Sequence, residues 1–196
     1  PYKDINDFEE EYFKGVSLNN LISIGLEKKI ITKSELDDNP LLYYDLPEKK
    51  LIQKINSQIH WMSYYKYWDP QENYYYASEN CSFTPNDERT ESTYSKYASI
   101  DDETDGIHYF MSYIKFGLGR ATSDAAHEIR DDHITREEGI QLVKKFDGEF
   151  PDRYFNEIMD YLDIKKDIFF KKCDRFRSPH LWKKKNNSWK LRFTVY

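Results

Sequence analysis

Residues 107–130 read IHYFMSYIKFGLGRATSDAAHEIR, and this stretch decides the fold. Aromatic and aliphatic residues crowd Ile107–Phe116, which predicts a helix with a buried face. Gly117-Leu118-Gly119 interrupts that helix, and a second helical pattern follows from about Ala121 to Arg130. The sequence therefore predicts two helices joined by a glycine corner.

Helical patterns continue on both sides of this corner. Ser17 is a candidate N-cap near the N-terminus, and Asp69 followed by Pro70 marks another helix start. Thr135 and Glu138 have the spacing of a capping box. Further helices are predicted at residues 4–31, 47–55, 70–79, 135–148, 151–162 and 164–176.

Two β-structures are predicted in this largely helical chain. Residues 59–68 have strand composition, and residues 181–195 read as a β-hairpin with a polar turn. We therefore expect a mainly α fold: a helical bundle-like domain with one short strand and a C-terminal hairpin. We divide it into an N-terminal helical segment, residues 1–56, and a helical region, residues 57–196, that ends in the hairpin.

Composition and charge narrow the class of protein. Lys and Arg total 29 and Asp and Glu total 35 among 196 residues, and the net charge of −6 argues against nucleic-acid binding. Aromatic residues make up 17%, which indicates a folded domain with an aromatic-rich core. Cys81 and Cys173 form no CxxC pair, which is typical of free thiols in a cytoplasmic protein. We find no apolar run as long as a membrane span, and because the chain begins at Pro1 without Met, we expect a distal piece of a longer protein.

The segment from Asn80 to Asp105 has no periodicity and is longer than most connections, so it is expected to be either functional or disordered. It carries hydroxyl and cationic donors that suit the hydroxyls and diphosphate of a sugar nucleotide. A solvated connector would have much the same composition. The candidate binding residues here are Arg89, Thr90, Tyr94 and Lys96.

The glycine corner is a second candidate site. Gly117 and Gly119 would let the backbone approach a ligand, and the helix start that follows, including Thr122, would present free N–H groups to a phosphate or carboxylate. Lys115 and Arg120 would add cations on either side. The alternative is a helix–helix corner with surface cations. The spacing matches neither a Walker A loop nor a Rossmann turn.

His108 shares a helix face with Lys115, which suggests the wall of a site, although a packed histidine beside a snorkelling lysine has the same pattern. Arg120 and Asp124 have the spacing of a surface salt bridge. The remaining histidines, His60, His133 and His180, show no metal-ligand spacing, so we predict no metal. The sequence assigns no catalytic residue.

A series of blocks along the chain is distinctive both in sequence and in order. These blocks are Trp68–Tyr76 (WDPQENYYY), Asn86–Tyr97 (NDERTESTYSKY), His108, Lys115–Thr122 (KFGLGRAT), Ala125–Arg130 (AAHEIR), Ile134–Gly139 (ITREEG) and Phe176–Trp182 (FRSPHLW). Together they resemble the C-terminal half of the N-acetyl sugar amidotransferases, bacterial enzymes of lipopolysaccharide O-antigen and related surface-sugar biosynthesis. The resemblance extends over about residues 60–185.

The resemblance implies PP-loop ATP pyrophosphatase chemistry. ATP with Mg adenylates the oxygen of the N-acetyl group of a UDP-linked sugar, and ammonia displaces AMP to leave an acetamidino group. A separate glutaminase subunit supplies the ammonia. The family's nucleotide loop, Ser-Gly-Gly-x-Asp-Ser, and its cysteine pairs belong to the N-terminal half and are absent from this sequence. The resemblance thus implies the distal part of a larger α/β enzyme that does not bind ATP productively by itself.

Within that resemblance, the candidate residues of the loop and the corner would contact the anionic sugar nucleotide or the departing pyrophosphate. Two other functions stay open. One is a non-catalytic helical interaction module whose aromatic surface docks a partner protein. The other is a different PP-loop ATP pyrophosphatase with another acceptor, such as tRNA, against which the acidic charge counts.

Overall fold

The structure, a computed structural model, describes residues 2–3, 17–38, 40–44, 47–56 and 58–196. The chain divides into two compact units, Pro1–Trp68 and Asp69–Tyr196. The predicted domain boundary after residue 56 stays a prediction.

The first unit consists of short elements. Ser17 accepts a hydrogen bond from the Asn20 N–H at 3.0 Å and caps the first described helix, as predicted. The predicted helical segment at residues 4–16 lies outside the described residues. The elements are β1 (Tyr2–Lys3), α2 (Leu18–Glu27), η2 (Ser34–Leu36), η3 (Leu42–Tyr44), α3 (Lys49–Ile55), β2 (Ile59–His60) and α4 (Met62–Tyr65).

The predicted strand at residues 59–68 is much shorter than expected. Of these residues, Ile59–His60 forms a strand, paired antiparallel with Tyr2–Lys3, and Met62–Tyr65 forms a helical turn. The reason lies in the period of the pattern: polar side chains recur at every third residue, His60, Ser63 and Lys66, whereas a half-buried strand needs alternation. Aromatic composition without that alternation does not specify a strand.

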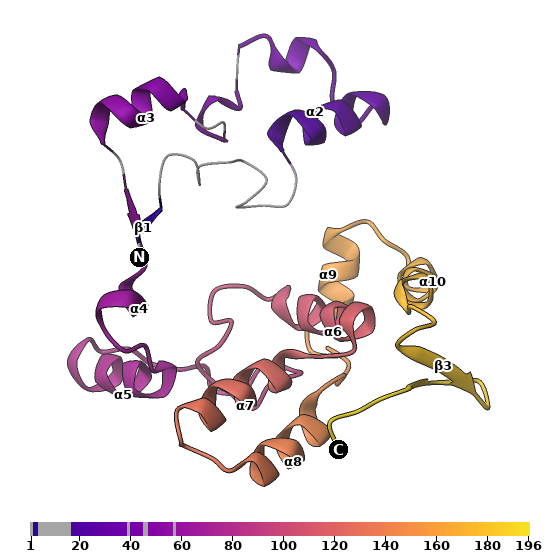
Figure 1. The fold of residues 1–196 in the computed structure, drawn as a ribbon. Helices are drawn as coiled ribbons and strands as arrows, with labels where there is room; N and C mark the ends of the chain where they lie inside the picture. The colour runs from indigo at the N-terminus through magenta and orange to yellow at the C-terminus, as the bar shows by residue number, and fades with distance from the viewer. Residues whose placement is uncertain (1, 4–16, 39, 45–46, 57) are drawn as a thin grey trace. The chain divides into compact units, whose positions relative to one another are not determined.

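The second unit is helical and ends in the predicted hairpin (Figure 1). Asp69 accepts hydrogen bonds from the Gln71 and Glu72 N–H groups, and Thr135 and Glu138 form the predicted capping box. The elements are α5 (Pro70–Asn80), α6 (Asp105–Phe116), α7 (Arg120–Arg130), α8 (Arg136–Phe146), α9 (Phe155–Tyr161), α10 (Lys166–Phe176), β3 (Trp182–Lys185) and β4 (Ser188–Leu191).

One helix start differs from the prediction. Pro151 does not open a helix; it is buried, and α9 begins only at Phe155. Phe150, directly before the proline, packs its ring against Phe110 and Phe155, at centroid distances of 5.2 and 4.8 Å. Packing of this ring therefore overrides the local helix signal of the proline.

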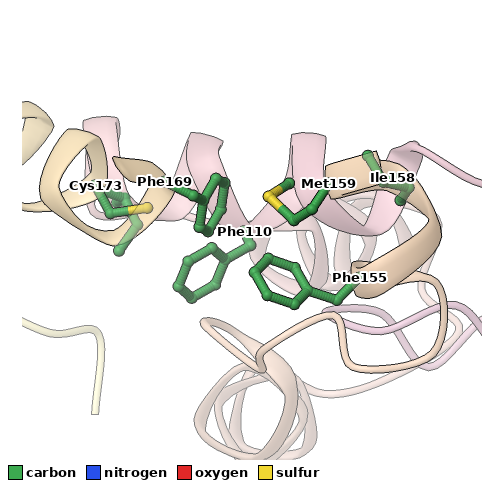
Figure 2. Close-up of a cluster of buried hydrophobic side chains, with 7 residues drawn as sticks. Phe110, Phe155, Ile158, Met159, Phe169 and Cys173 are labelled. Atoms are coloured by element: carbon green, nitrogen blue, oxygen red, sulfur yellow. The ribbon is translucent and has the colours of Figure 1, made fainter. Parts of the chain in front are cut away.

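The main core lies where α6, α9 and α10 meet. Phe110 comes from α6, Phe155, Ile158 and Met159 from α9, and Phe169 from α10, with Cys173 at the edge (Figure 2). Full burial of such a side chain contributes about 1.5–3 kcal/mol. The cluster confirms the aromatic-rich core expected from composition.

Close approach of α7 and α8 depends on a glycine. A Cβ added at Gly139 of α8 would lie 2.7 Å from Cδ1 of Ile129 on α7 and 3.5 Å from Cβ of Ala125. Both faces are otherwise apolar, with Ala121 and Ala125 on one helix and Val143 on the other buried. The small residues let the two helices pack side by side, as Figure 1 shows.

The hairpin is anchored to the core at one end. The Trp182 indole donates to the Ile114 carbonyl of α6 at 2.7 Å, and the Arg177 guanidinium lies 5.3 and 5.5 Å from the ring centroids of Trp182 and Trp189. Asn186 and Asn187 both have positive φ, 50° and 60°, which is the geometry of a tight type I′ turn. The terminal hairpin is therefore a fixed element of this unit.

Replacing Phe155 with alanine should lower the free energy of unfolding by about 3–5 kcal/mol, because it leaves a cavity between three helices. Urea unfolding followed by circular dichroism measures the change. Tyr161→Ala, on the same helix but 82% exposed, is the control and should change stability far less. Equal effects of the two substitutions would contradict the assignment of the core.

Candidate functional site

The long segment between α5 and α6, residues 81–104, is ordered by polar contacts. Ser92 and Thr93 are fully buried. The Arg89 guanidinium donates to both oxygens of Glu149, at 2.6 and 2.7 Å, and the Ser92 N–H donates to the same carboxylate at 2.9 Å. Because these bonds are charge-assisted and bidentate, they fix the loop against the end of α8.

The Arg89 pair has an electrostatic signature. Hydrogen bonds from the Arg89 guanidinium hold the pKa of the Glu149 carboxyl below its usual value, and the same bonds raise the pKa of Arg89. Arg89 also stacks on Phe146, with its guanidinium carbon 4.7 Å from the ring centroid. The ion pair of Arg89 and Glu149 therefore holds the loop against the chain that follows α8. We call this pair the Arg89–Glu149 clasp.

The glycine corner holds an anion that belongs to the chain itself. The Asp147 carboxylate accepts from the Gly119 N–H at 2.9 Å, the Thr122 N–H at 3.2 Å and the Thr122 hydroxyl at 2.5 Å. A Cβ at Gly119 would lie 2.5 Å from an Asp147 oxygen, so this position requires glycine for close approach. The N–H groups at the start of α7, which we expected to bind an anionic ligand, are therefore already bonded to the Asp147 carboxylate.

Arg120 is likewise engaged inside the unit. Its Nε donates to Asp124 at 2.8 Å and its Nη1 to the Tyr109 hydroxyl at 3.1 Å. The second oxygen of Asp124 accepts from the buried Thr93 hydroxyl at 2.6 Å. The pair anticipated from spacing is present, and it connects α7 to the loop and to α6.

The other candidates lie apart from one another. His108 and Lys115 are exposed on α6, and Lys115 lies over the Phe116 ring at 5.2 Å. Lys96 is exposed and donates to the Asp87 carbonyl at 2.7 Å. Tyr94 packs near Phe146, and burial raises the pKa of its hydroxyl. The structure does not bring the predicted residues into one pocket, and their role in binding stays a prediction.

An acidic cleft of about 980 Å³ lies between the loop and α9. Seven carboxylates line it, against the single guanidinium of Arg153. Of the sequence candidates only Thr90 reaches it. The acidic cleft is lined by Asn86, Asp87, Glu88, Thr90, Glu91, Ser99, Ile100, Asp101, Asp102, Glu103, Thr104, Gly106, Arg153, Tyr154, Glu157, Ile158 and Tyr161.

Several of these carboxylates are held in place. Asp102 accepts from the Thr104 hydroxyl and N–H, both at 2.7 Å, and these bonds lower the pKa of its carboxyl. Glu91 accepts from the Arg153 N–H at 3.0 Å, and Glu88 accepts from the Arg153 guanidinium at 2.6 Å. The cleft therefore presents fixed acceptors to a ligand.

A second hollow of about 600 Å³ adjoins the acidic cleft, and Asp87, Glu88, Glu91 and Arg153 line both. Arg89 and Lys96 line it as well, so that three cations stand among the five carboxylates Asp87, Glu88, Glu91, Glu149 and Asp152. We call it the cationic-edged hollow. The two candidate cations of the loop thus lie beside the cleft, although spacing alone did not show what they adjoin.

A third hollow, of about 310 Å³ and mostly apolar, lies beside the hairpin and includes Gly117 and Thr122.

Among the described residues no group of three or more His, Cys, Asp and Glu side chains could hold a metal ion. In the same part of the chain no helix has the length and apolar character that crossing a bilayer requires.

Sequence reasoning missed most of the acidic cleft. The run Asp101-Asp102-Glu103 was a usable signal of acidity in the loop. Nothing local indicates that it faces Arg153 and Glu157, which lie about fifty residues further along the chain. That juxtaposition comes from the packing of α9 against α6.

Comparison with known proteins gives one family. A family model described as "LPS biosynthesis protein WbpG-like, C-terminal domain" matches residues 91–195, more than half of the chain. The match begins in the loop and runs through α6–α10 to the hairpin. No curated protein matches the chain.

Asp147→Ala should lower the free energy of unfolding by about 1–3 kcal/mol, since it removes the acceptor of three hydrogen bonds at a helix start. Urea unfolding measures the loss, and Asp147→Asn, which keeps one acceptor oxygen, should lose less. Asp152→Ala, an exposed neighbour, is the control. If Asp147→Ala and Asp152→Ala unfold at the same urea concentration, the carboxylate does not hold the corner.

The Arg89–Glu149 clasp should make stability depend on pH. Because the folded-state pKa of Glu149 lies below its unfolded value of about 4.3, its stabilisation is complete above that pH and is lost as pH falls through the folded pKa. Glu149→Gln should therefore flatten the acid limb of a plot of stability against pH. Glu137→Gln, an exposed carboxyl of α8, should leave that limb unchanged. Identical acid limbs for wild type and Glu149→Gln would rule out the linkage.

Proposed function

Since the chain belongs to the family of WbpG-like lipopolysaccharide biosynthesis proteins, whose C-terminal domain its residues 91–195 match, we propose that it is the sugar-binding part of an amidotransferase. The enzyme would convert the N-acetyl group of a nucleotide-linked sugar into an acetamidino group with ammonia. The observation that carries this proposal is the acidic cleft.

The charge change of the reaction explains why such a cleft would suit it. An acetamido group is neutral, whereas an acetamidino group is a planar, protonated amidinium at neutral pH and resembles part of an arginine side chain. Positive charge also develops on the attacking nitrogen. Fixed carboxylates stabilise such charge more strongly in the transition state and product than in the substrate, which is how electrostatic catalysis lowers a barrier.

The lining of the cleft also suits a sugar ring. Carboxylates such as Asp102 and Glu157 accept hydrogen bonds from hydroxyl groups, and Thr90 and Asn86 can both donate and accept. Tyr154 and Tyr161 add aromatic rings at the side formed by α9, and Tyr161 is 82% exposed. A polyhydroxyl ligand with a group that becomes cationic matches this mixture better than a bare anion does.

We assign the diphosphate of a UDP-linked sugar to the adjoining cationic-edged hollow. Lys96 is the cation of this hollow best able to bind a ligand. Its ammonium donates to the Asp87 carbonyl and has further N–H donors for a phosphate. Arg153 spans both hollows. The sugar would then lie in the acidic cleft, with its phosphates toward Lys96, since the Arg153 guanidinium is bonded to Glu88 and to the Arg89 carbonyl.

The helix start at the glycine corner is not free to bind the phosphates of ATP. The most obvious helix start, that of α7, is engaged by Asp147, and the Ala121 N–H donates to the Ser92 carbonyl at 3.0 Å. The sequence also lacks the Ser-Gly-Gly-x-Asp-Ser loop. We therefore assign ATP, its Mg ion and the activation step to another part of the protein, and the ammonia to a glutaminase partner.

A second candidate function is favoured by a different observation. The segment Trp61–Trp68 exposes six large apolar side chains, each by 48% or more: Trp61, Met62, Tyr64, Tyr65, Tyr67 and Trp68. Exposed aromatic residues gathered in one segment are typical of protein interfaces. The chain would then be a non-catalytic module that docks a partner protein.

Calorimetry with two probes tests the proposed function. UDP-N-acetylglucosamine and its analogue with an acetamidino group should both bind, and the acetamidino analogue should bind more tightly. Glu157→Gln and Asp102→Asn should each weaken the acetamidino analogue by about tenfold or more, because each removes a charge-assisted hydrogen bond, and should affect the acetamido probe less.

Glu137→Gln, which changes the net charge equally but lies outside the cleft, is the matched control. Equal affinity for the two probes, or equal loss with Glu137→Gln, would refute the role of the carboxylates. Binding of a glutaminase with no binding of either sugar would favour the interaction module.

A further inference from the structure

Positive charge is concentrated at the C-terminal end of this acidic chain. Residues 163–196 carry eleven Lys and Arg but only three Asp and Glu, whereas the whole chain has a net charge of −6. These residues form α10 and the hairpin, which lie beside each other: the Trp189 indole donates to Asp174 at 2.9 Å. A charge asymmetry of this size is typical of proteins that meet an anionic surface.

The hairpin arranges its lysines on one face. The strand register places Lys183 directly opposite Lys190, and alternation places Lys185 on the same side as Lys183. All three are exposed, and no carboxylate of a described residue lies within ion-pair distance of them. We call these three side chains the lysine face.

Like charges directly opposite each other on neighbouring strands destabilise a hairpin. Here the rest of the unit holds the hairpin in place: the Trp182 indole is bonded to the Ile114 carbonyl, and Arg177 stacks on Trp182 and Trp189. The cations are therefore held together in the absence of a ligand. An anionic surface laid against the face would relieve their mutual repulsion.

Clustered lysines of this kind bind the headgroup region of an anionic bilayer by charge. Lysine, a flexible point charge, suits a diffuse field, whereas docking on defined carboxylates or phosphates favours the planar fork of arginine.

We propose that the lysine face docks the protein peripherally on an anionic phospholipid surface. The inference does not depend on the sugar site, because none of these residues lines the acidic cleft or the cationic-edged hollow. A cationic end on an otherwise acidic chain would also orient the molecule, since the acidic part is repelled by the same surface.

Flotation of the full 196-residue chain with vesicles tests the proposal. The chain should float with vesicles of phosphatidylglycerol and phosphatidylcholine in about equal amounts, should remain at the bottom with phosphatidylcholine alone, and should be released by salt. The variant Lys183→Gln, Lys185→Gln, Lys190→Gln should reduce partitioning by about fivefold per lysine, or about a hundredfold in total.

The matched control is Lys29→Gln, Lys33→Gln, Lys50→Gln, which removes the same charge from exposed lysines of the first unit and should float like wild type. Lys190→Gln alone, with a salt series, covers the case in which the triple variant does not fold. Flotation that is equal with neutral vesicles, or equally reduced in the control, would overturn the proposal. So would salt-sensitive self-association without flotation, which would indicate that the face binds a second copy of the chain.

Discussion

The tripeptide Asp147-Gly148-Glu149, which follows α8, is the constraint on which the second unit depends. Asp147 binds the start of α7, and Glu149 binds the loop through Arg89 and Ser92. Gly148 lies between them with φ +78°, and a Cβ there would collide with the Tyr113 ring of α6. Two adjacent carboxylates thus serve different segments because one residue without a side chain reverses the backbone direction between them.

This arrangement changes what the unit can offer to a ligand. The strongest anion-binding groups, the α7 start and Arg89, are consumed by internal carboxylates. What stays open to solvent is mostly acidic: the cleft against α9, where Arg153 is the single cation of the lining. A site of this polarity favours a ligand that gains positive charge, and the phosphates of such a ligand would lie at the edge of the hollow and not in its centre.

Local signals in the sequence were sufficient where the structure is decided by neighbours in the chain. Ser17, Asp69 and Thr135 cap helices through bonds that span two or three residues, and the Asn186-Asn187 turn closes the hairpin within four. The role of Gly119 could not be read in the same way, because its partner Asp147 is 28 residues away. The acidic cleft needs contacts between segments more than fifty residues apart, and side-chain identity alone does not encode them.

The burial of Cys173 has a practical consequence. Its sulfur lies in the core 3.5 Å from Met111, and burial raises the pKa of the thiol, whereas Cys81 is exposed at the end of α5. The reactive thiolate at Cys173 forms only when α6, α9 and α10 separate. The chain thus carries its own pair of chemical reporters: an alkylating reagent labels Cys81 at once, and the slow labelling of Cys173 records how often the core opens.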